Sequence, residues 1–227
     1  MNRIITVLVF TLVTMGATAQ INEVGVFLGG GNYIGDVGPG YYVSPNNFAG
    51  GIMYRWNRSL RHSYRFNLNL TGISARDSDA DSPGRTDRGY SFKNRITEVS
   101  AGIEFDFFEF DLHHFDPQIT PYVFTGLSYF RYNELYVENG ETRQDGRRSG
   151  LGIPMLVGVK MRIGQDFVLG LEVGFRYTFT DNLDGSNPKK PELAPFRFGN
   201  LNSNDWYVMS GFTLTYTFGD NPCFCPR

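Results

Sequence analysis

A repeat of period two constrains this chain more than any other feature. Seven large apolar residues take every second position of residues 167–180: Phe167, Leu169, Leu171, Val173, Phe175, Tyr177 and Phe179. The positions between them hold glycine, threonine, valine and charged residues. Because successive side chains of a strand point to opposite faces, this pattern predicts a strand with one apolar face. Seven more segments alternate in a similar way: 21–29, 48–56, 60–71, 98–107, 120–132, 152–163 and 206–219. Aromatic residues occupy both faces of 120–132, so the orientation of that strand stays open.

The connections between these segments alternate between long and short. Four long connections are rich in Gly, Pro, Asp, Asn and Ser, which are typical of loops: 31–47, 75–94, 135–150 and 182–204. Three short connections lie between them: 57–59, 110–118 and 164–166. This rhythm predicts one domain, an eight-stranded antiparallel up-and-down β-barrel. We expect the barrel to span residues 20–219.

The N-terminal segment has the pattern of a cleaved signal peptide. Arg3 precedes an apolar run over residues 4–13, which is too short to span a bilayer, and Ala17-Thr18-Ala19 is typical of a cleavage site. We therefore predict a signal peptide over residues 1–19 and a mature chain that begins at Gln20. The chain is then exported.

The second face of the strands is small or charged, and it carries charges of both signs. We expect these side chains to point into the barrel lumen and to form ion pairs there: Glu23, Arg55, Arg61, Arg65, Glu98, Glu104, Asp106, Lys160, Arg162, Glu172 and Arg176. A membrane barrel is filled by such residues while lipid contacts its apolar outer face. A soluble β-sandwich or a lipocalin-like barrel, which buries its apolar face, is the alternative fold.

Aromatic residues gather near both ends of the strands, as in outer-membrane barrels. One group lies near the short turns: Tyr54, Trp56, Tyr64, Phe107, Phe167, Tyr216 and Phe218. Another lies near the long loops: Tyr177, Phe179, Trp206 and Tyr207. We expect a multi-pass barrel in the cell outer membrane, in contact with lipid, with the termini and short turns in the periplasm and the long loops outside the cell.

Catalytic and ligand-binding motifs are weak in this sequence. The three histidines, His62, His113 and His114, all map to the short-turn end, so the long loops lack the commonest general base. The Asp77 to Asp81 run lacks the glycine and the final acid of a calcium loop, and we interpret it as a solvated loop. The formal net charge of -2 gives no reason to expect nucleic acid as a partner. We expect no enzyme activity, cofactor, metal or small-molecule substrate. The bore of eight strands is filled by side chains, which argues against a channel.

The two cysteines, Cys223 and Cys225, lie in a tail that we expect to cover residues 220–227 in the periplasm. Two interpretations fit this position: the thiols contact a partner protein, or the tail has no role.

Three segments resemble a known family: residues 23–36, residues 50–61, and the Tyr216 to Gly219 ending with its short Cys-Pro tail. Together they are similar to the PorG-type barrels of Bacteroidota, a component of the type IX secretion system. The resemblance implies an outer-membrane protein needed for protein transport and, in gliding species, for gliding motility. It also implies contact with a periplasmic ring that is built from a lipoprotein and its partner subunit.

The expected function is therefore a non-enzymatic scaffold that anchors or positions this ring. The candidate contacts follow from topology alone and all lie on the periplasmic side: Asn57, Arg58, Arg61, His113, His114, Phe115, Cys223 and Cys225. The alternative function is a surface adhesin or binding module that acts through the long loops.

Overall fold

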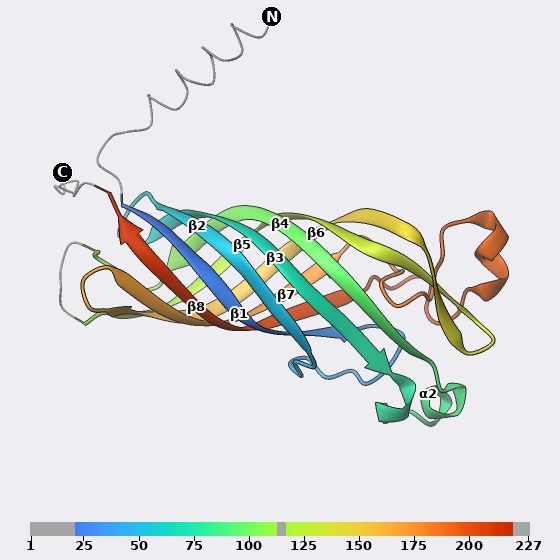
Figure 1. The fold of residues 1–227 in the computed structure, drawn as a ribbon. Coiled ribbons are helices and arrows are strands. Elements are labelled where there is room, and N and C mark those ends of the chain that lie inside the picture. The colour runs from blue at the N-terminus through green and yellow to red at the C-terminus, as the bar shows by residue number, and fades with distance from the viewer. Residues whose placement is uncertain (1–20, 113–116, 220–227) are drawn as a thin grey trace, which may run out of the picture.

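Eight antiparallel strands form one closed barrel in chain order (Figure 1). The computed structural model describes residues 21–112 and 117–219. The strands are β1 (Asn22–Ile34), β2 (Asn47–Asn57), β3 (His62–Arg76), β4 (Ser91–Asp106), β5 (Ile119–Glu138), β6 (Glu141–Ile163), β7 (Phe167–Thr178) and β8 (Trp206–Phe218). The predicted signal peptide over residues 1–19 and the predicted tail over residues 220–227 lie outside the described residues.

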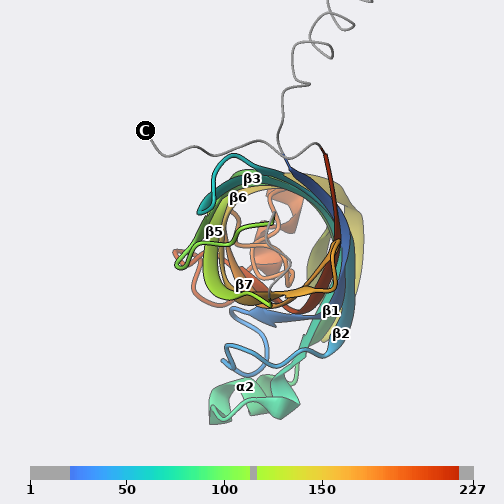
Figure 2. The same ribbon diagram turned by 90° about the vertical axis from the view of Figure 1, so that its left-hand side faces the viewer.

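The barrel closes where the first strand meets the last. β1 pairs with β8 from Asn22 opposite Phe218 to Ile34 opposite Trp206. Viewed from the end that carries residues 21 and 219, the strands form a ring (Figure 2). Closure leaves no unpaired strand edge, as a β-structure in lipid requires. The predicted up-and-down barrel is confirmed.

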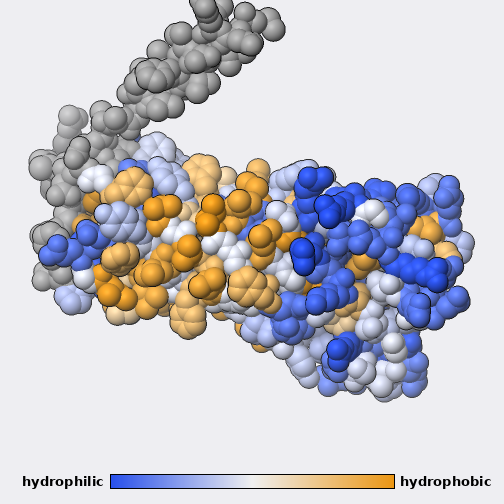
Figure 3. Space-filling view, viewed as in Figure 1, coloured by the Kyte–Doolittle hydropathy of each residue, from blue (hydrophilic) through white to orange (hydrophobic). Residues whose placement is uncertain are grey.

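The outer wall of the barrel carries a belt of exposed apolar side chains (Figure 3). On β6 the belt runs from Leu151 to Ile163 through every second residue. At about 3.3 Å per residue and a tilt of about 45°, this stretch spans about 28 Å, close to the apolar band of a membrane barrel. The belt therefore identifies the outer wall as the lipid-facing surface. Among the described residues, no helix has the length and apolar character to cross a bilayer.

The two ends of the barrel differ in their connections. Short turns join β2 to β3, β4 to β5 and β6 to β7 at the end near residues 21 and 219. At the other end, the β3–β4 connection holds η1 (Asp77–Asp79) and α2 (Pro83–Arg88), and the β7–β8 connection holds η2 (Pro191–Phe196). Proline at the first turn of α2 and the left-handed Gly89 after it, with a φ of 69°, start and stop this short helix.

The predicted long loop over residues 135–150 is wrong. β5 and β6 continue as strands to a turn at Asn139-Gly140, where both residues have positive φ, 54° and 81°. This is the geometry of a two-residue hairpin turn with Asn-Gly at its centre. Beyond the belt the β6 arm of the hairpin is polar on both faces, and on the β5 arm only Leu135 and Val137 are buried and apolar. The hairpin therefore lacks the apolar alternation by which the other strands are recognised. The predicted loop over 75–94 is also too long, because β3 continues to Arg76 and β4 begins at Ser91.

The orientation of the fifth strand, which the sequence left open, follows from burial. Tyr122, Phe124, Phe130 and Tyr132 are buried inside the barrel, and Leu127 on the alternate face is exposed. Phe130 and Tyr132 join an apolar core in the half of the lumen near the long loops, whereas Tyr122 and Phe124 form a separate small cluster with Leu156. The main members of the apolar core are Phe27, Tyr33, Met53, Ile73, Phe92, Ile96, Phe130, Tyr132, Leu135, Leu183, Tyr207 and Met209. The small and charged inner face predicted from the sequence therefore describes only the other half.

Candidate functional site

A network of buried ion pairs fills the lumen half near the short turns, and Glu104 on β4 is its hub. Arg55 Nε and Lys160 Nζ both lie 2.9 Å from Glu104 Oε1, and Arg65 Nη1 lies 3.2 Å from Oε2. All four side chains are almost fully buried. Their strands place them here because β2, β3, β4 and β6 all turn their polar face inward.

Each of these three cations also contacts a second carboxylate. The contacts are Arg55–Glu23 at 2.6 Å, Arg65–Glu172 at 2.9 Å and Lys160–Asp106 at 2.9 Å. Neutral donors add to the network, among them the Tyr122 hydroxyl, which donates to Glu172 at 2.7 Å, and the Thr215 hydroxyl, which donates to Glu23 at 2.6 Å. Because a buried charge is tolerated only when it is paired and hydrogen-bonded, the network accounts for the presence of these residues.

A second, smaller cluster surrounds Glu98. Arg176 Nε lies 3.3 Å from Glu98 Oε2, the Tyr207 hydroxyl donates to the same oxygen at 2.5 Å, and Asn69 donates to Oε1 at 3.1 Å. The cluster lies where the charged half of the lumen meets the apolar core. One cation and two neutral donors therefore share a single buried carboxylate.

Two predicted lumen residues differ from the rest. Arg162 lies at the short-turn end and donates to backbone carbonyls, among them that of Leu112 at 2.8 Å. Arg61 is not in the lumen: its exposed side chain lies in the β2–β3 turn, 3.4 Å from Glu109. β3 begins at His62, so Arg61 belongs to the turn before it. The alternation of inward and outward side chains holds only within the strand, and extending it to Arg61 gave the wrong position.

Both mouths of the lumen are covered by side chains. At the short-turn end, the buried Phe110 ring lies 5.0 Å from Lys160 Nζ. At the other end the β7–β8 connection inserts Leu183, which is fully buried in the apolar core. Its backbone is held on both sides: Asn94 Nδ2 donates to Leu183 O at 2.8 Å, and Leu183 N donates to Asp205 Oδ2 at 2.8 Å. We call the β7–β8 connection, residues 179–205, the cap.

Two buried aspartates hold the cap to β1. The Tyr33 hydroxyl donates to Asp184 Oδ2 at 2.8 Å and also contacts Asp205 Oδ1. Burial raises the pKa of both carboxyls, and their mutual repulsion raises that of Asp205 further. Burial likewise raises the pKa of the nearby Asp181 to about 6. The attachment of the cap therefore depends on carboxyls that bind protons more readily than usual.

The Asp77 to Asp81 run, which we expected to be a solvated loop, is exposed at Ser78, Asp79 and Asp81 but not at Asp77. Asp77 is buried and accepts hydrogen bonds from Arg88 Nε at 2.7 Å, Gly38 N at 2.9 Å and Tyr90 N at 3.0 Å. Burial alone would raise the pKa of Asp77, but these donors outweigh it and hold the pKa below its ordinary value. In the described part of the chain, no cluster of three His, Cys, Asp or Glu side chains is placed to hold a metal.

The short turns at the other end lie against one another. Phe110 N donates to Leu60 O at 2.9 Å, which joins the β4–β5 connection to the β2–β3 turn that carries Arg58 and Arg61. Arg162 joins the β4–β5 connection to the β6–β7 turn through its bonds to Leu112 O and Gly164 O. Asn57 points inward and donates to Glu23 Oε1 at 2.9 Å. The other candidate contacts, His113, His114, Phe115, Cys223 and Cys225, lie outside the described residues.

His62 is the histidine that the structure describes, and its described neighbours do not form a catalytic arrangement. Its Nδ1 lies 3.3 Å from the Ser59 hydroxyl in an exposed turn, and its ring packs 5.1 Å from that of Phe105. These contacts shape the β2–β3 turn.

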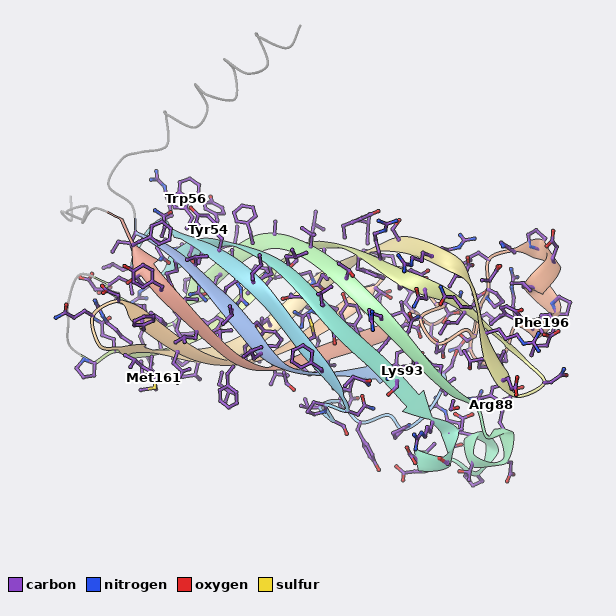
Figure 4. All side chains as sticks on the ribbon, in the orientation of Figure 1. Tyr54, Trp56, Arg88, Lys93, Met161 and Phe196 are labelled. Carbon is purple, nitrogen blue, oxygen red and sulfur yellow. The ribbon has the colours of Figure 1, made fainter. Side chains whose placement is uncertain are left out.

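Sequence reasoning missed one group of charged residues, on the outer wall. Lys93 and Arg95 on β4, Arg131 on β5 and Arg147 on β6 point outward, beyond the apolar belt, at the long-loop end. Figure 4 labels Lys93 on this side of the barrel, away from Tyr54 and Trp56 near the short turns. The sequence did indicate these residues: counting in steps of two from the outward-facing Val99 and Tyr129 leads to Arg95 and Lys93 on β4 and to Arg131 on β5.

Solved barrels are similar to this chain at low identity. The Ail attachment invasion locus protein of Yersinia pestis is 11% identical, with a TM-score of 0.48 over 88% of this chain and 100% of that chain. The N-terminal β-barrel domain of Pseudomonas aeruginosa OprF is 12% identical, with a TM-score of 0.47 over 88% and 98%. A major outer membrane protein of Thermus thermophilus is 14% identical, with a TM-score of 0.49 over 88% and 100%.

A comparison with curated proteins gave no match. The family model described as "Domain of unknown function (DUF6089)" matches residues 2–227. The closed sheet and its lipid-facing belt make the chain a small β-barrel of the outer-membrane type. Because the match covers nearly the whole chain, this barrel belongs to the DUF6089 family.

Proposed function

We propose that this barrel is a non-enzymatic outer-membrane component of the type IX protein secretion system, and that it anchors or positions the periplasmic ring. The observation that carries the proposal is the filled lumen. Ion pairs occupy one half, an apolar core occupies the other, and Phe110 and Leu183 cover the two mouths. A barrel closed in this way acts through its ends and its outer wall.

The resemblance to PorG-type barrels favours the short-turn end as the working surface. In this orientation the short turns and both chain ends face the periplasm, where the ring lipoprotein and its partner subunit lie. The exposed part of this surface includes Arg58, Arg61 and the large apolar side chains Phe107 and Phe108. The hydrogen bonds between the turns make it one continuous surface, which suits a docking site for a rigid partner.

Charge reversal tests this surface. The variant Arg58→Glu/Arg61→Glu is expected to lower co-purification of the ring lipoprotein from solubilised envelopes at least tenfold. Both side chains are exposed and the Arg61–Glu109 pair is a surface pair, so the barrel itself is expected to fold normally. The matched control is Arg143→Glu/Lys190→Glu, which makes the same charge change at the long-loop end. Unchanged ring recovery with the first variant would remove the proposed contact surface.

Cross-linking tests the candidate contacts that lie outside the described residues. Photo-cross-linkers at His113, His114 and Phe115, and thiol cross-linkers at Cys223 and Cys225, are expected to capture the ring lipoprotein or its partner subunit. A cross-linker at Asn139, on the tip of the β5–β6 hairpin, is the control. Capture from Asn139 alone would contradict the proposed orientation.

One observation favours the alternative, a surface adhesin or binding module. The cap and the β3–β4 connection are held by buried hydrogen bonds at Asp77, Leu183 and Asp205, so the long-loop end has a defined shape. Removing residues 137–144 at the hairpin tip would then abolish binding to surfaces and leave ring association intact. Loss of ring association with intact surface binding would exclude this alternative.

A further inference from the structure

The outer wall of the barrel has a basic hollow just beyond the apolar belt. It has a volume of about 850 Å³ and extends over β2 to β6 at the long-loop end. Its cationic side chains are Lys93, Arg95, Arg131 and Arg147, and no carboxylate of the described residues lines it. Because pockets of this size hold whole small ligands, the hollow is large enough for a headgroup with more than one charge.

The strand register gathers the cations of the basic hollow around Arg131. Arg131 lies opposite Thr97 on β4 and opposite Ser149 on β6. Arg95 and Arg147 are each two residues beyond these partners, so they lie diagonally across from Arg131 on the two flanking strands. Side chains in this relation are within reach of a shared ligand. Arg95 also lies opposite Gly72, whose missing side chain leaves room for Asn47, another residue that lines the hollow.

These cations differ from the other basic residues at the long-loop end. Arg148 pairs with Glu134, Arg143 with Glu138 and Lys190 with Asp145. In contrast, none of the four basic-hollow side chains forms an ion pair or a hydrogen bond with another residue of the described chain. Like charges on neighbouring strands repel one another, and a bound anion would offset this repulsion.

The position of the basic hollow indicates which anion this is. Along β4 the outward side chains change from Ile103 and Val99, which are exposed and apolar, to Arg95 and Lys93. Exposed Phe48 and Leu70 form the belt side of the hollow itself. A ligand here meets apolar surface on one side and cations on the other. That pattern matches a lipid whose acyl chains lie on the belt and whose phosphates lie just above it.

We propose that the basic hollow binds a phosphorylated glycolipid headgroup of the outer leaflet. The four cations contact its phosphates, its sugar lies beside Asn47 and Asn133, which line the hollow, and its acyl chains extend over Phe48 and Leu70. This inference rests on the orientation given in the proposed function, in which the long loops face outside the cell. It adds a lipid site on the wall of the barrel, separate from the ring contact at the short turns.

The test is a titration of the purified, detergent-solubilised barrel, followed by native mass spectrometry. The probe is lipid A with two phosphates, and the comparison lipids are the same lipid A without phosphates and inorganic phosphate alone. The variant is Arg95→Gln/Arg131→Gln. The control is Arg143→Gln/Lys190→Gln, which removes two charges from the same end outside the hollow. A third variant, Arg95→Lys/Arg131→Lys, keeps the charge.

We expect the diphosphorylated lipid to bind at least tenfold more tightly than the dephosphorylated one. Arg95→Gln/Arg131→Gln is expected to lower the affinity for the diphosphorylated lipid at least tenfold. The control is expected to lower it less than twofold, and the lysine variant is expected to retain most of the binding. Equal affinity for the two lipids, equal losses in variant and control, or full competition by inorganic phosphate would each overturn the proposal.

Ring association separates this inference from the proposed function. Arg95→Gln/Arg131→Gln is expected to lose lipid affinity and to co-purify with the ring lipoprotein as the unaltered protein does. If Arg58→Glu/Arg61→Glu leaves ring association unchanged, the proposed function fails while a tenfold lipid effect still supports the basic hollow. If the lipid effect is absent and ring association depends on Arg58 and Arg61, only the lipid site is refuted.

Discussion

The variant Arg65→Leu tests whether the lumen network stabilises the barrel through paired charges. Arg65 contacts two carboxylates, Glu104 and Glu172. After the substitution Glu104 still contacts Arg55 and Lys160, so the loss falls on Glu172, which keeps only the Tyr122 hydroxyl. Removing one partner of a buried pair leaves an uncompensated charge and costs about 3–5 kcal/mol. We expect the free energy of unfolding to fall by that amount.

A double-mutant cycle isolates the pair. Glu172→Leu alone leaves Arg65 with Glu104, and Arg65→Leu/Glu172→Leu removes both charges together. We expect the double variant to be more stable than the sum of the single effects predicts, by about 1–3 kcal/mol. The measurement is reversible urea unfolding in lipid vesicles, with barrel closure followed by electrophoretic mobility without heating.

Arg61→Leu is the control for the same change of residue type. Arg61 and Glu109 are 46% and 64% exposed, so their pair contributes less than about 1 kcal/mol. The reasoning would be refuted if Arg65→Leu were as stable as the unaltered barrel, or if the two single effects simply added. Additive effects would mean that packing of the arginine stem, and not charge pairing, is what the lumen needs.

Three further predictions concern other parts of the barrel. Arg176→Leu is expected to destabilise the barrel by less than Arg65→Leu, because Glu98 keeps its bonds from Tyr207 and Asn69; a rise in thermal stability on this change would contradict the lumen assignment. The cap is expected to be better protected at pH 5 than at pH 8. The pKa values of Asp184, Asp205 and Asp181 are raised in the folded cap, to about 6 for Asp181, so the folded state binds protons more readily than the unfolded state. The stability of the cap therefore falls as pH rises from the ordinary carboxyl pKa near 4 through the raised pKa values. Hydrogen exchange of residues 181–186, corrected for intrinsic rates, measures this, and Asp205→Asn should weaken the dependence. Gly126→Ala is expected to cost about 1–3 kcal/mol, because its Cβ would lie 2.1 Å from Ala101 O on β4. Gly84→Ala, which meets no atom within 4 Å, should leave unfolding by urea unchanged.

The strands were predictable from the sequence wherever one face meets lipid. Lipid imposes apolar side chains at every second position, so segments such as 167–180 show a clear period of two. Above the belt no lipid imposes this contrast on the β5–β6 hairpin, and its β6 arm carries polar residues on both faces, which is why residues 135–150 were predicted to be a loop. Asn139-Gly140 was the remaining signal, because this dipeptide favours a two-residue hairpin turn.

The inner face was only partly predictable. Charged residues such as Arg65 and Glu172 alternate with lipid-facing residues, so the sequence could predict that both point into the lumen. It could not predict which of them pair, because that depends on strand register across the barrel. Phe92 and Ile96 are inward and apolar on a strand whose outward residues there are Lys93 and Arg95. At this level of the barrel the polar side chains face outward and the apolar side chains face inward. The outer wall here lies beyond the hydrocarbon layer of the membrane, and the interior is an apolar core. A rule that assigns polar residues to the lumen fails at that level.

The seam between β1 and β8 also constrains how this protein is assembled. Glu23 on β1 contacts Arg55 on β2 and Thr215 on β8, so one carboxylate joins the first two strands to the last. Until β1 and β8 pair, both seam strands have open edges and water can enter the lumen. The desolvated network is completed only at that pairing. Closing the seam and completing the network are therefore one event, and a chain that lacks β8 would have neither a closed wall nor a fully paired interior.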